Sequence, residues 1–121
     1  MKRVVKAVAA LIILSWIITW VAFGRPTIFG IRPFFVMTDS MEPTIHARSF
    51  ILAVPVWSED VREGDIVVYR RPASRFLAFS VVHRVIRIED DGNIFIFRGD
   101  HEKEEDTPVS ADQIRYRVIY P

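Results

Sequence analysis

Cysteine is absent from the 121 residues of this chain. Its absence excludes disulfide bonds, thiolate zinc sites and a cysteine nucleophile. Lysine is almost absent from the body of the chain: after Lys6 the only lysine is Lys103, which lies between two glutamates. A basic excess is missing too, because residues 24–121 hold 13 Lys and Arg against 15 Asp and Glu, a net charge of −2. Nucleic acid is therefore not an expected partner.

Charge is also missing near the N-terminus, where residues 7–24 contain no charged side chain and are mostly apolar. Twenty helical residues, such as 4–23, match a hydrocarbon core of about 30 Å at about 1.5 Å per residue, provided that Lys6 reaches the interface. Three basic residues precede this span, and the positive-inside rule then predicts a cytoplasmic N-terminus. We expect residues 1–24 to form a cytoplasmic tail and single-pass anchor in the cell membrane, and residues 25–121 to form an extracytoplasmic domain.

A cleaved signal peptide is the alternative interpretation of this segment. Ala22, Phe23 and Gly24 form a small-x-small sequence of the kind that precedes a cleavage site. The apolar stretch is, however, longer than the apolar core of a usual signal peptide. This length favours a retained anchor, which is our prediction.

Short runs of β-branched and aromatic residues dominate the rest of the chain. They predict six strands, at residues 34–37, 50–54, 66–69, 81–88, 94–97 and 114–120. The sequence Asp-Asp-Gly-Asn at 90–93 predicts a hairpin between the fourth and fifth strands, and residues 70–72 (Arg-Arg-Pro) predict the end of the third. No amphipathic helix follows the first segment. We therefore predict a mostly β fold, with a single N-terminal transmembrane helix followed by one small β-rich domain.

One serine lies where the first of these strands must end. Residues 38–44 read Thr-Asp-Ser-Met-Glu-Pro-Thr, and Pro43 cannot continue a central strand. The hydroxyl of Ser40, beside the apolar run at 34–37, is well placed to act as a nucleophile. A lone serine at such a position more often makes a turn hydrogen bond. The hypothesis therefore requires a general base and an orienting acid elsewhere in the chain.

His83 is the candidate base, in the sequence Val-Val-His-Arg-Val at 81–85. A histidine in an otherwise apolar strand is more often held in the core by a backbone carbonyl, which is the competing interpretation. Lys103 is a poorer base, because a lysine base must be neutral near pH 7 and the neighbouring glutamates favour its charged form. His46 is expected at the surface. No spacing of histidines and carboxylates predicts a metal site, and no cofactor is expected.

Two aspartates are candidates for the orienting acid. Asp100 follows Arg98 and Gly99, which come directly after the run at 94–97, and Asp106 stands six residues later. On local order alone Asp100 is the better choice, because backbone pairing would hold its position. The residues between the two aspartates are mostly acidic, and this run also fits a solvated loop without any further role.

Four sequences in this order resemble the signature sequences of the type I signal peptidases, membrane-bound serine proteases that remove leader peptides. They are Ser-Met-Glu-Pro at 40–43, Gly-Asp-Ile-Val at 64–67, Val-Val-His-Arg-Val at 81–85 and Gly-Asp at 99–100. The third resembles the archaeal and endoplasmic-reticulum branch, whereas the bacterial branch has a lysine base. The chain departs from the family at Asp39, where glycine is common, and at His101 and Glu102, where asparagine is usual.

The resemblance implies a triad of Ser40, His83 and an aspartate. It favours Asp106 as the partner of His83, with Asp100 as a supporting residue, and so differs from the choice made on local order. It also implies an oxyanion site made of the Ser40 backbone N–H and the Thr38 hydroxyl.

The function implied by the resemblance is cleavage of N-terminal signal peptides from exported preproteins. An extended substrate would lie along the strand of Phe34, Phe35, Val36 and Met37 and add main-chain hydrogen bonds to it. The expected partners are the signal peptides of preproteins, membrane lipid and the secretion translocon. Two other classes of protein are alternatives. The first is a non-catalytic membrane-anchored β module of the same fold that binds peptides or proteins. The second is an autoproteolytic repressor domain, which would need a DNA-binding domain where this chain has an apolar span.

Overall fold

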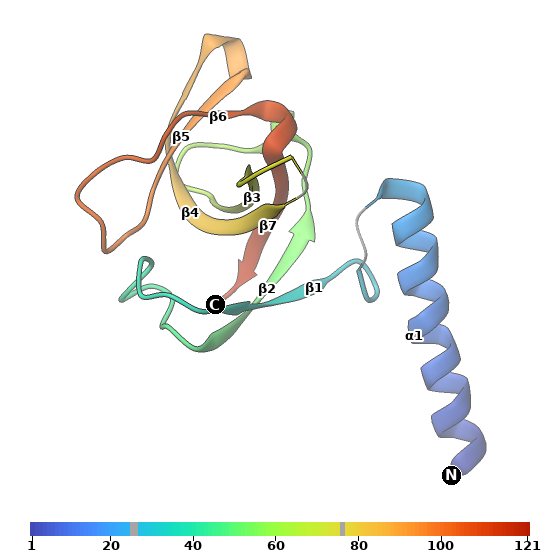
Figure 1. Ribbon diagram of the computed structural model, residues 1–121. Helices are drawn as coiled ribbons and strands as arrows, with labels where there is room; N and C mark the ends of the chain where they lie inside the picture. The colour runs from blue at the N-terminus through green and yellow to red at the C-terminus, as the bar shows by residue number, and fades with distance from the viewer. Residues whose placement is uncertain (25–26, 76) are drawn as a thin grey trace. The chain divides into compact units, whose positions relative to one another are not determined.

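The computed structural model describes residues 1–24, 27–75 and 77–121. The chain divides into two units, Met1–Arg32 and Pro33–Pro121. The sequence predicts the division after residue 24. Residues 25 and 26, which follow this position, lie outside the described residues, so the proposed boundary stays a prediction. Figure 1 shows the helix α1 of the first unit and the strands of the second.

The first unit contains one long helix, α1 (Lys2–Phe23). It ends at Gly24, which adopts the left-handed conformation with φ 63° and donates its N–H to the carbonyl of Trp20. The part Lys2–Ala22 is long and apolar enough to cross a membrane, and none of its side chains is buried. The expected N-terminal apolar helix is thus confirmed as a candidate membrane span.

The second unit is built on one mostly antiparallel sheet of seven strands, in the order β1-β2-β7-β3-β4-β5-β6 (Figure 1). The strands are β1 (Arg32–Val36), β2 (Ser49–Pro55), β3 (Ile66–Pro72), β4 (Ala78–Glu89), β5 (Ile94–Arg98), β6 (Val109–Ser110) and β7 (Ile114–Tyr120). Three short 3₁₀ helices, Ser58–Asp60, Asp90–Gly92 and Ala111–Gln113, connect them. The prediction of a mostly β fold after one apolar helix is confirmed.

The predicted hairpin is present between β4 and β5, which pair from Glu89 and Ile94 onward. Its turn contains Asp90, Asp91 and Gly92, all with positive φ. Aspartate tolerates this conformation better than most residues and glycine adopts it freely, so the Asp-Asp-Gly sequence suits the turn.

Most strand boundaries differ from the sequence prediction by one to three residues, and one strand was not predicted. β3 does not stop at Arg70 but continues to Pro72, because its last residues pair with the start of β4 at Ala78. β1 begins at Arg32 and includes Pro33, which an edge strand tolerates because its missing N–H can face away from the neighbouring strand. The two-residue strand β6 has too little sequence pattern to be predicted.

Two groups of buried side chains fill the second unit. The first, which we call the hairpin core, consists of Val56, Val61, Val67, Tyr69, Val85, Phe95, Phe97, Val109 and Ile114. The second, the edge core, consists of Val36, Met41, Ile45, Ile51, Ala53, Val68 and Tyr116. Burying one such side chain typically stabilises a fold by roughly 1.5–3 kcal/mol. The edge core fixes the segment after β1, whereas the hairpin core fixes β4, β5 and the loop that follows β5.

Candidate active site

Ser40 is held in place by its neighbour in the chain. Met41 is fully buried in the edge core, and its carbonyl accepts a hydrogen bond from the N–H of Ile45, which is buried beside it. The carbonyl of Ser40 itself accepts a hydrogen bond from the N–H of His101 at 2.9 Å. These contacts fix the backbone of Ser40 and Met41. The Ser40 residue lines a cleft.

His83 lies within β4, where it is paired with Val67 of β3 and is only 6% exposed. Its Nε2 atom is 3.1 Å from the hydroxyl oxygen of Ser40. The Thr38 hydroxyl lies 3.2 Å from the same oxygen. Residues 43 positions apart in the sequence thus form a hydrogen-bonded pair of a hydroxyl and an imidazole, with a second hydroxyl beside it.

The other ring nitrogen of His83, Nδ1, makes a short hydrogen bond to Oδ2 of Asp106. The backbone N–H of Asp106 donates to the carbonyl of Phe97 at 2.8 Å, which fixes the loop against β5. The hydroxyl of Tyr69 donates to the same Oδ2 at 2.9 Å, and Arg71 donates to that hydroxyl in turn. Ser40, His83 and Asp106 therefore lie in one hydrogen-bonded series.

Tyr69 is a member of this site that the sequence analysis missed. Its ring is fully buried in the hairpin core and stacks on Phe97 with 4.4 Å between ring centroids. Burial, and then the hydrogen bond to Asp106, raise the pKa of its phenol, so the hydroxyl stays a donor. The sequence predicted a strand that ends with Tyr69, but no sequence signal pairs its hydroxyl with a residue 37 positions later.

Asp100 lies in a different arrangement from Asp106. Arg84 donates to both of its carboxylate oxygens, at 2.9 and 2.7 Å, and the Thr44 hydroxyl donates to Oδ2 at 2.6 Å. These bonds, that of Arg84 above all, hold the pKa of Asp100 below its usual value. Arg84 also donates to the carbonyl of Gly64. Asp100 thus connects the loop after Ser40 to β4, next to His83.

Gly99 lies where three parts of the site approach one another. A Cβ atom at this position would be 2.5 Å from the carbonyl oxygen of Ser40, and 3.1 Å from Nε2 of His83. Backbone cannot yield cheaply to such a contact, so a side chain here would push the Ser40 segment away from the imidazole.

Gly99→Ala is therefore expected to lower the free energy of unfolding by about 1–3 kcal/mol, as overpacking of a close contact does. The measurement is the thermal midpoint of the purified full chain in detergent. Thr107→Ala, an exposed change in the same loop, is the matched control. If Gly99→Ala has the same thermal midpoint as the control, the close approach of Gly99 to the Ser40 carbonyl is not needed for stability.

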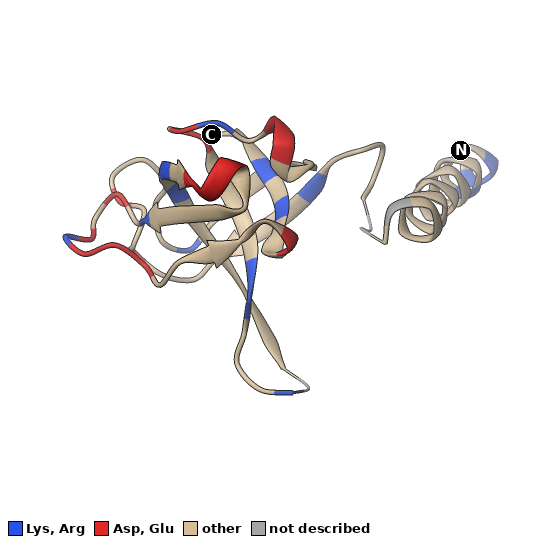
Figure 2. Cartoon of the chain, turned by 90° about the horizontal axis from the view of Figure 1, so that it is seen from above, with Lys and Arg blue, Asp and Glu red and all other residues tan. Residues whose placement is uncertain are grey.

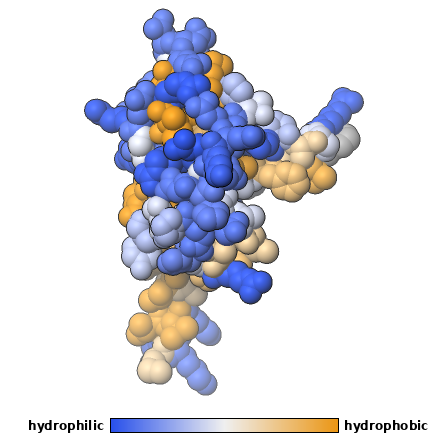
Figure 3. All heavy atoms as spheres, turned by 90° about the vertical axis from the view of Figure 1, so that its left-hand side faces the viewer, coloured by the Kyte–Doolittle hydropathy of each residue, from blue (hydrophilic) through white to orange (hydrophobic). Residues whose placement is uncertain are grey.

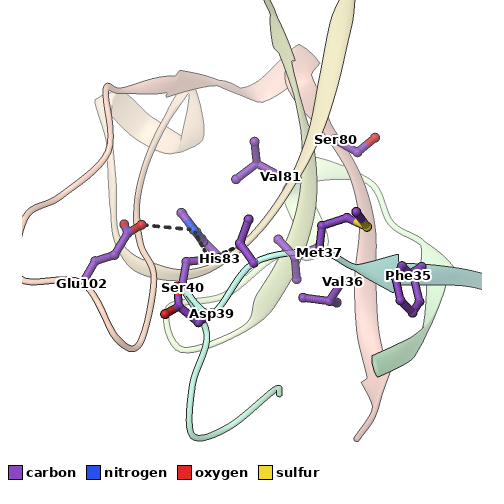
Figure 4. Close-up of a pocket in the computed structure, with 11 residues that line it drawn as sticks. Phe35, Val36, Met37, Asp39, Ser40, Ser80, Val81, His83 and Glu102 are labelled. Carbon is purple, nitrogen blue, oxygen red and sulfur yellow. Dashed lines mark hydrogen bonds and ion pairs between the residues drawn. The ribbon is translucent and has the colours of Figure 1, made fainter. Parts of the chain in front are cut away.

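The cleft beside Ser40 has a volume of about 380 Å³. Its lining residues come from β1 and the segment after it, from β4 and from the loop after β5: Phe35, Val36, Met37, Thr38, Asp39, Ser40, Ser80, Val81, Val82, His83 and Glu102 (Figure 4). Three of the four residues expected to contact a substrate are among them. The fourth, Phe34, packs edge-on against Tyr116 in the edge core instead, with 5.2 Å between ring centroids.

The other residues considered as a general base do not contact Ser40. His46 is exposed and bonds to Glu42, and Lys103 is exposed in the acidic loop. One group of side chains could supply ligands to a metal ion. It consists of His83, Glu102 and Asp106, whose ligand atoms lie within 4.8 Å of one another. The Asp106 oxygen, however, already accepts from both His83 and Tyr69.

Comparison with known proteins gives the family. A family model described as signal peptidase, peptidase S26, matches residues 1–106, most of the chain. The chain belongs to this signal peptidase family. The resemblance to the type I signal peptidases, including the endoplasmic-reticulum type, is thereby confirmed.

Individual signal peptidases resemble only part of this chain. Signal peptidase I W of Bacillus subtilis (strain 168) is 29% identical over 96 residues, which cover 76% of this chain and 48% of that protein. The signal peptidase complex catalytic subunit SEC11C of Homo sapiens, like that of Canis lupus familiaris, is 31% identical over 74 residues, which cover 59% of this chain and 37% of that subunit. The chain thus matches half or less of the length of these curated relatives.

One departure from the pattern of the signal peptidases has a simple structural account. Asp39 stands where the family commonly has glycine. The non-glycine residues with positive φ in the described part of the chain are Phe29, Arg48, Asp90 and Asp91, and Asp39 is not among them. The backbone before Ser40 therefore accepts a side chain without strain, and the Asp39 carboxylate lines the cleft.

Proposed function

We propose that this chain is a membrane-bound serine endopeptidase that cleaves N-terminal signal peptides from exported preproteins. The observation that carries the proposal is the series of hydrogen bonds from the Ser40 hydroxyl through His83 to Asp106, with 3.1 Å between Ser40 and the imidazole. This is the arrangement of nucleophile, base and orienting acid that serine proteases with a Ser-His-Asp triad use for acyl transfer. Membership of the signal peptidase family supports the substrate class.

In this proposal the Ser40 oxygen attacks the scissile carbonyl while Nε2 of His83 takes its proton. His83 then gives that proton to the leaving amine, and later removes a proton from the water that hydrolyses the acyl-enzyme. Asp106 fixes the tautomer of His83 and stabilises the imidazolium, and Tyr69 holds the Asp106 carboxylate in place.

Negative charge that develops on the carbonyl oxygen needs donors. The Ser40 backbone N–H is one, and the Thr38 hydroxyl, 3.2 Å from the Ser40 hydroxyl oxygen, is the second. Removing one such donor typically raises the barrier by about 3 kcal/mol.

The substrate would lie in an extended conformation along β1. This strand is at the edge of the sheet, with β2 as its neighbour, so its other side is available for main-chain hydrogen bonds. The cleft beside it is small and partly apolar, lined by Phe35, Val36, Met37 and Val81. Such a cleft suits the small side chains that precede the cleavage site of a leader peptide.

The proposal places the N-terminus in the cytoplasm, α1 in the membrane, and residues 25–121 on the extracytoplasmic side. Signal peptides also lie in membrane lipid, and tethering both partners to one bilayer raises their effective concentration. The secretion translocon, which delivers preproteins, is a further proposed partner in the same membrane.

The proposed topology predicts that protease added to spheroplasts degrades the second unit. The reason is that the three basic residues Lys2, Arg3 and Lys6 lie at the N-terminal end of α1, and the rest of the helix carries no charge. Immunoblotting with an antibody against the C-terminus measures the loss. Protection that lasts until the membrane is lysed would reverse the orientation, and a second unit free in the medium would indicate a cleaved signal peptide.

The experiment that tests the function is incubation of the full chain in lipid vesicles with a preprotein that carries a fluorophore at its N-terminus. We expect release of a labelled fragment of the length of the signal peptide. If the folded, membrane-embedded chain leaves the preprotein intact, the non-catalytic β module becomes the better account.

A further inference from the structure

We propose that Glu102 is a specificity-determining residue, whose carboxylate favours a substrate with a cationic side chain directly after the scissile bond. The inference rests on the proposed function and concerns the same cleft. It is independent of the triad, because Glu102 takes no part in the proton transfers described above.

The position of Glu102 is the first argument. Its Oε1 atom lies 4.0 Å from Nε2 of His83, and its side chain lines the cleft. Its backbone N–H donates to the carbonyl of Gly99 at 2.9 Å, which fixes the turn that carries it. Figure 4 shows Glu102 on one side of His83, with Met37 and Phe35 on the other.

The direction of the substrate follows from the chemistry. Residues before the scissile bond lie along β1, next to Phe35 and Met37. His83 must give its proton to the leaving amine, so the residue that carries this amine has to lie close to Nε2. The carboxylate 4.0 Å from Nε2 is therefore within reach of the side chain of that residue, at the end of the cleft away from the apolar part.

The charge of the cleft is the second argument. Its lining residues include two carboxylates, those of Glu102 and Asp39, and neither lysine nor arginine. A cationic substrate side chain would supply the missing positive charge, whereas an acidic one would be repelled.

Most other carboxylates of the loop are already paired. Asp100 pairs with Arg84, Glu105 with Arg87, and Asp106 with His83. Among the described residues, the cationic partner within 4.0 Å of Glu102 is His83 alone, and this imidazole is charged only when protonated.

Figure 2 shows the loop as an acidic stretch at the edge of the unit, and Figure 3 shows that the face carrying it is mostly hydrophilic. The Glu102 side chain is 41% exposed, so water screens its attraction. We therefore expect a moderate preference, about fivefold for lysine over glutamine, as exposed ion pairs give.

The test uses three preproteins that differ only in the first residue after the cleavage site: lysine, glutamine or glutamate. The full chain in neutral lipid vesicles cleaves them at low salt, and kcat/KM is measured for each. We expect the order lysine, glutamine, glutamate, with about a fivefold step from lysine to glutamine. At about 1 M salt, where the screening length falls to about 3 Å, the step should shrink toward one.

The matched variants are Glu102→Gln and Glu104→Gln. Both remove one exposed charge from the same loop, but Glu104 is not among the residues that line the cleft. Glu102→Gln should bring the lysine-to-glutamine ratio toward one, and Glu104→Gln should leave it unchanged. The readout is the ratio of kcat/KM between two substrates. A loss of turnover that affects both substrates equally therefore does not change it.

The outcomes separate this inference from the proposed function. If the wild-type chain cleaves none of the three preproteins, the proposed function fails. If it cleaves all three with equal kcat/KM, the proposed function stands and the role of Glu102 is wrong. A preference that both variants reduce equally would also overturn it, because the effect would then belong to the net charge of the loop.

Discussion

Ser40→Ala and His83→Ala are each expected to lower kcat/KM for preprotein cleavage by roughly 10⁴-fold or more, and to leave the chain folded and membrane-bound. The alanine at 40 removes one hydroxyl beside a cleft, and the buried neighbour Met41 still anchors the segment. The alanine at 83 removes the imidazole that lies 3.1 Å from the Ser40 hydroxyl and is proposed to accept its proton. The double variant should lose no more than either single one, because the two groups act as a unit.

His46→Ala is the matched control for the histidine. His46 lies six residues after Ser40, but its side chain is 74% exposed and contacts Glu42 rather than the Ser40–His83 pair. We expect it to cleave at the wild-type rate. Turnover is measured beside the thermal midpoint for each variant. If Ser40→Ala or His83→Ala also cleaves at the wild-type rate, that residue is wrongly assigned.

Asp106→Asn is expected to lower turnover by roughly 10³–10⁴-fold with substrate binding intact. The carboxylate oxygen that accepts from Nδ1 of His83 also accepts from the Tyr69 hydroxyl. An amide that places its N–H₂ group at this position favours the His83 tautomer without a free Nε2, and one that places its oxygen there lacks the negative charge that stabilises the imidazolium. Single-turnover rates and KM for a preprotein measure the two effects separately.

Asp100→Asn is the matched comparison, because it removes the same charge six residues away. It leaves Arg84 without its carboxylate partner, so we expect a loss of about 1–3 kcal/mol in stability and a smaller loss of turnover. The pKa of Asp100 is lowered in the folded chain. Its ionised form therefore stabilises the fold above the unfolded pKa of about 3.9, and this contribution disappears as the pH falls through the lower folded value.

The thermal midpoints of the wild type and of Asp100→Asn should therefore differ at neutral pH and converge in acid. If Asp106→Asn is active while Asp100→Asn is folded but inactive, Asp100 is the partner of His83 and Asp106 is the supporting residue.

Much of the fold could be predicted because its signals are local. The apolar helix, the strands that contain Phe50, Val67 and Ile96, and the hairpin turn at Asp91 each have a composition that dictates a backbone conformation. The errors arose where pairing overrides composition. β3 runs on through two arginines to Pro72 because β4 pairs with it there, and no property of those three residues shows this by itself.

The site could be predicted only in part, for a related reason. The proposed nucleophile, base and acids stand in short sequences that resemble those of a known family, so Ser40, His83 and Asp106 could be named in advance. The structure places them within hydrogen-bonding distance of one another. The supporting contacts are tertiary. The hydrogen bond of the Tyr69 hydroxyl and the close backbone approach at Gly99, which leaves no room for a Cβ atom, depend on how distant strands pack, and the sequence does not display this.

The measurement that tests the central claim most directly is the mass of the products from one preprotein, incubated in matched vesicles with the wild-type chain and with Ser40→Ala. The account predicts one cut by the wild type, after a small side chain at the end of the signal peptide, and no product from the folded variant. The same cut made by Ser40→Ala, or an intact preprotein beside a folded wild-type chain, would contradict it.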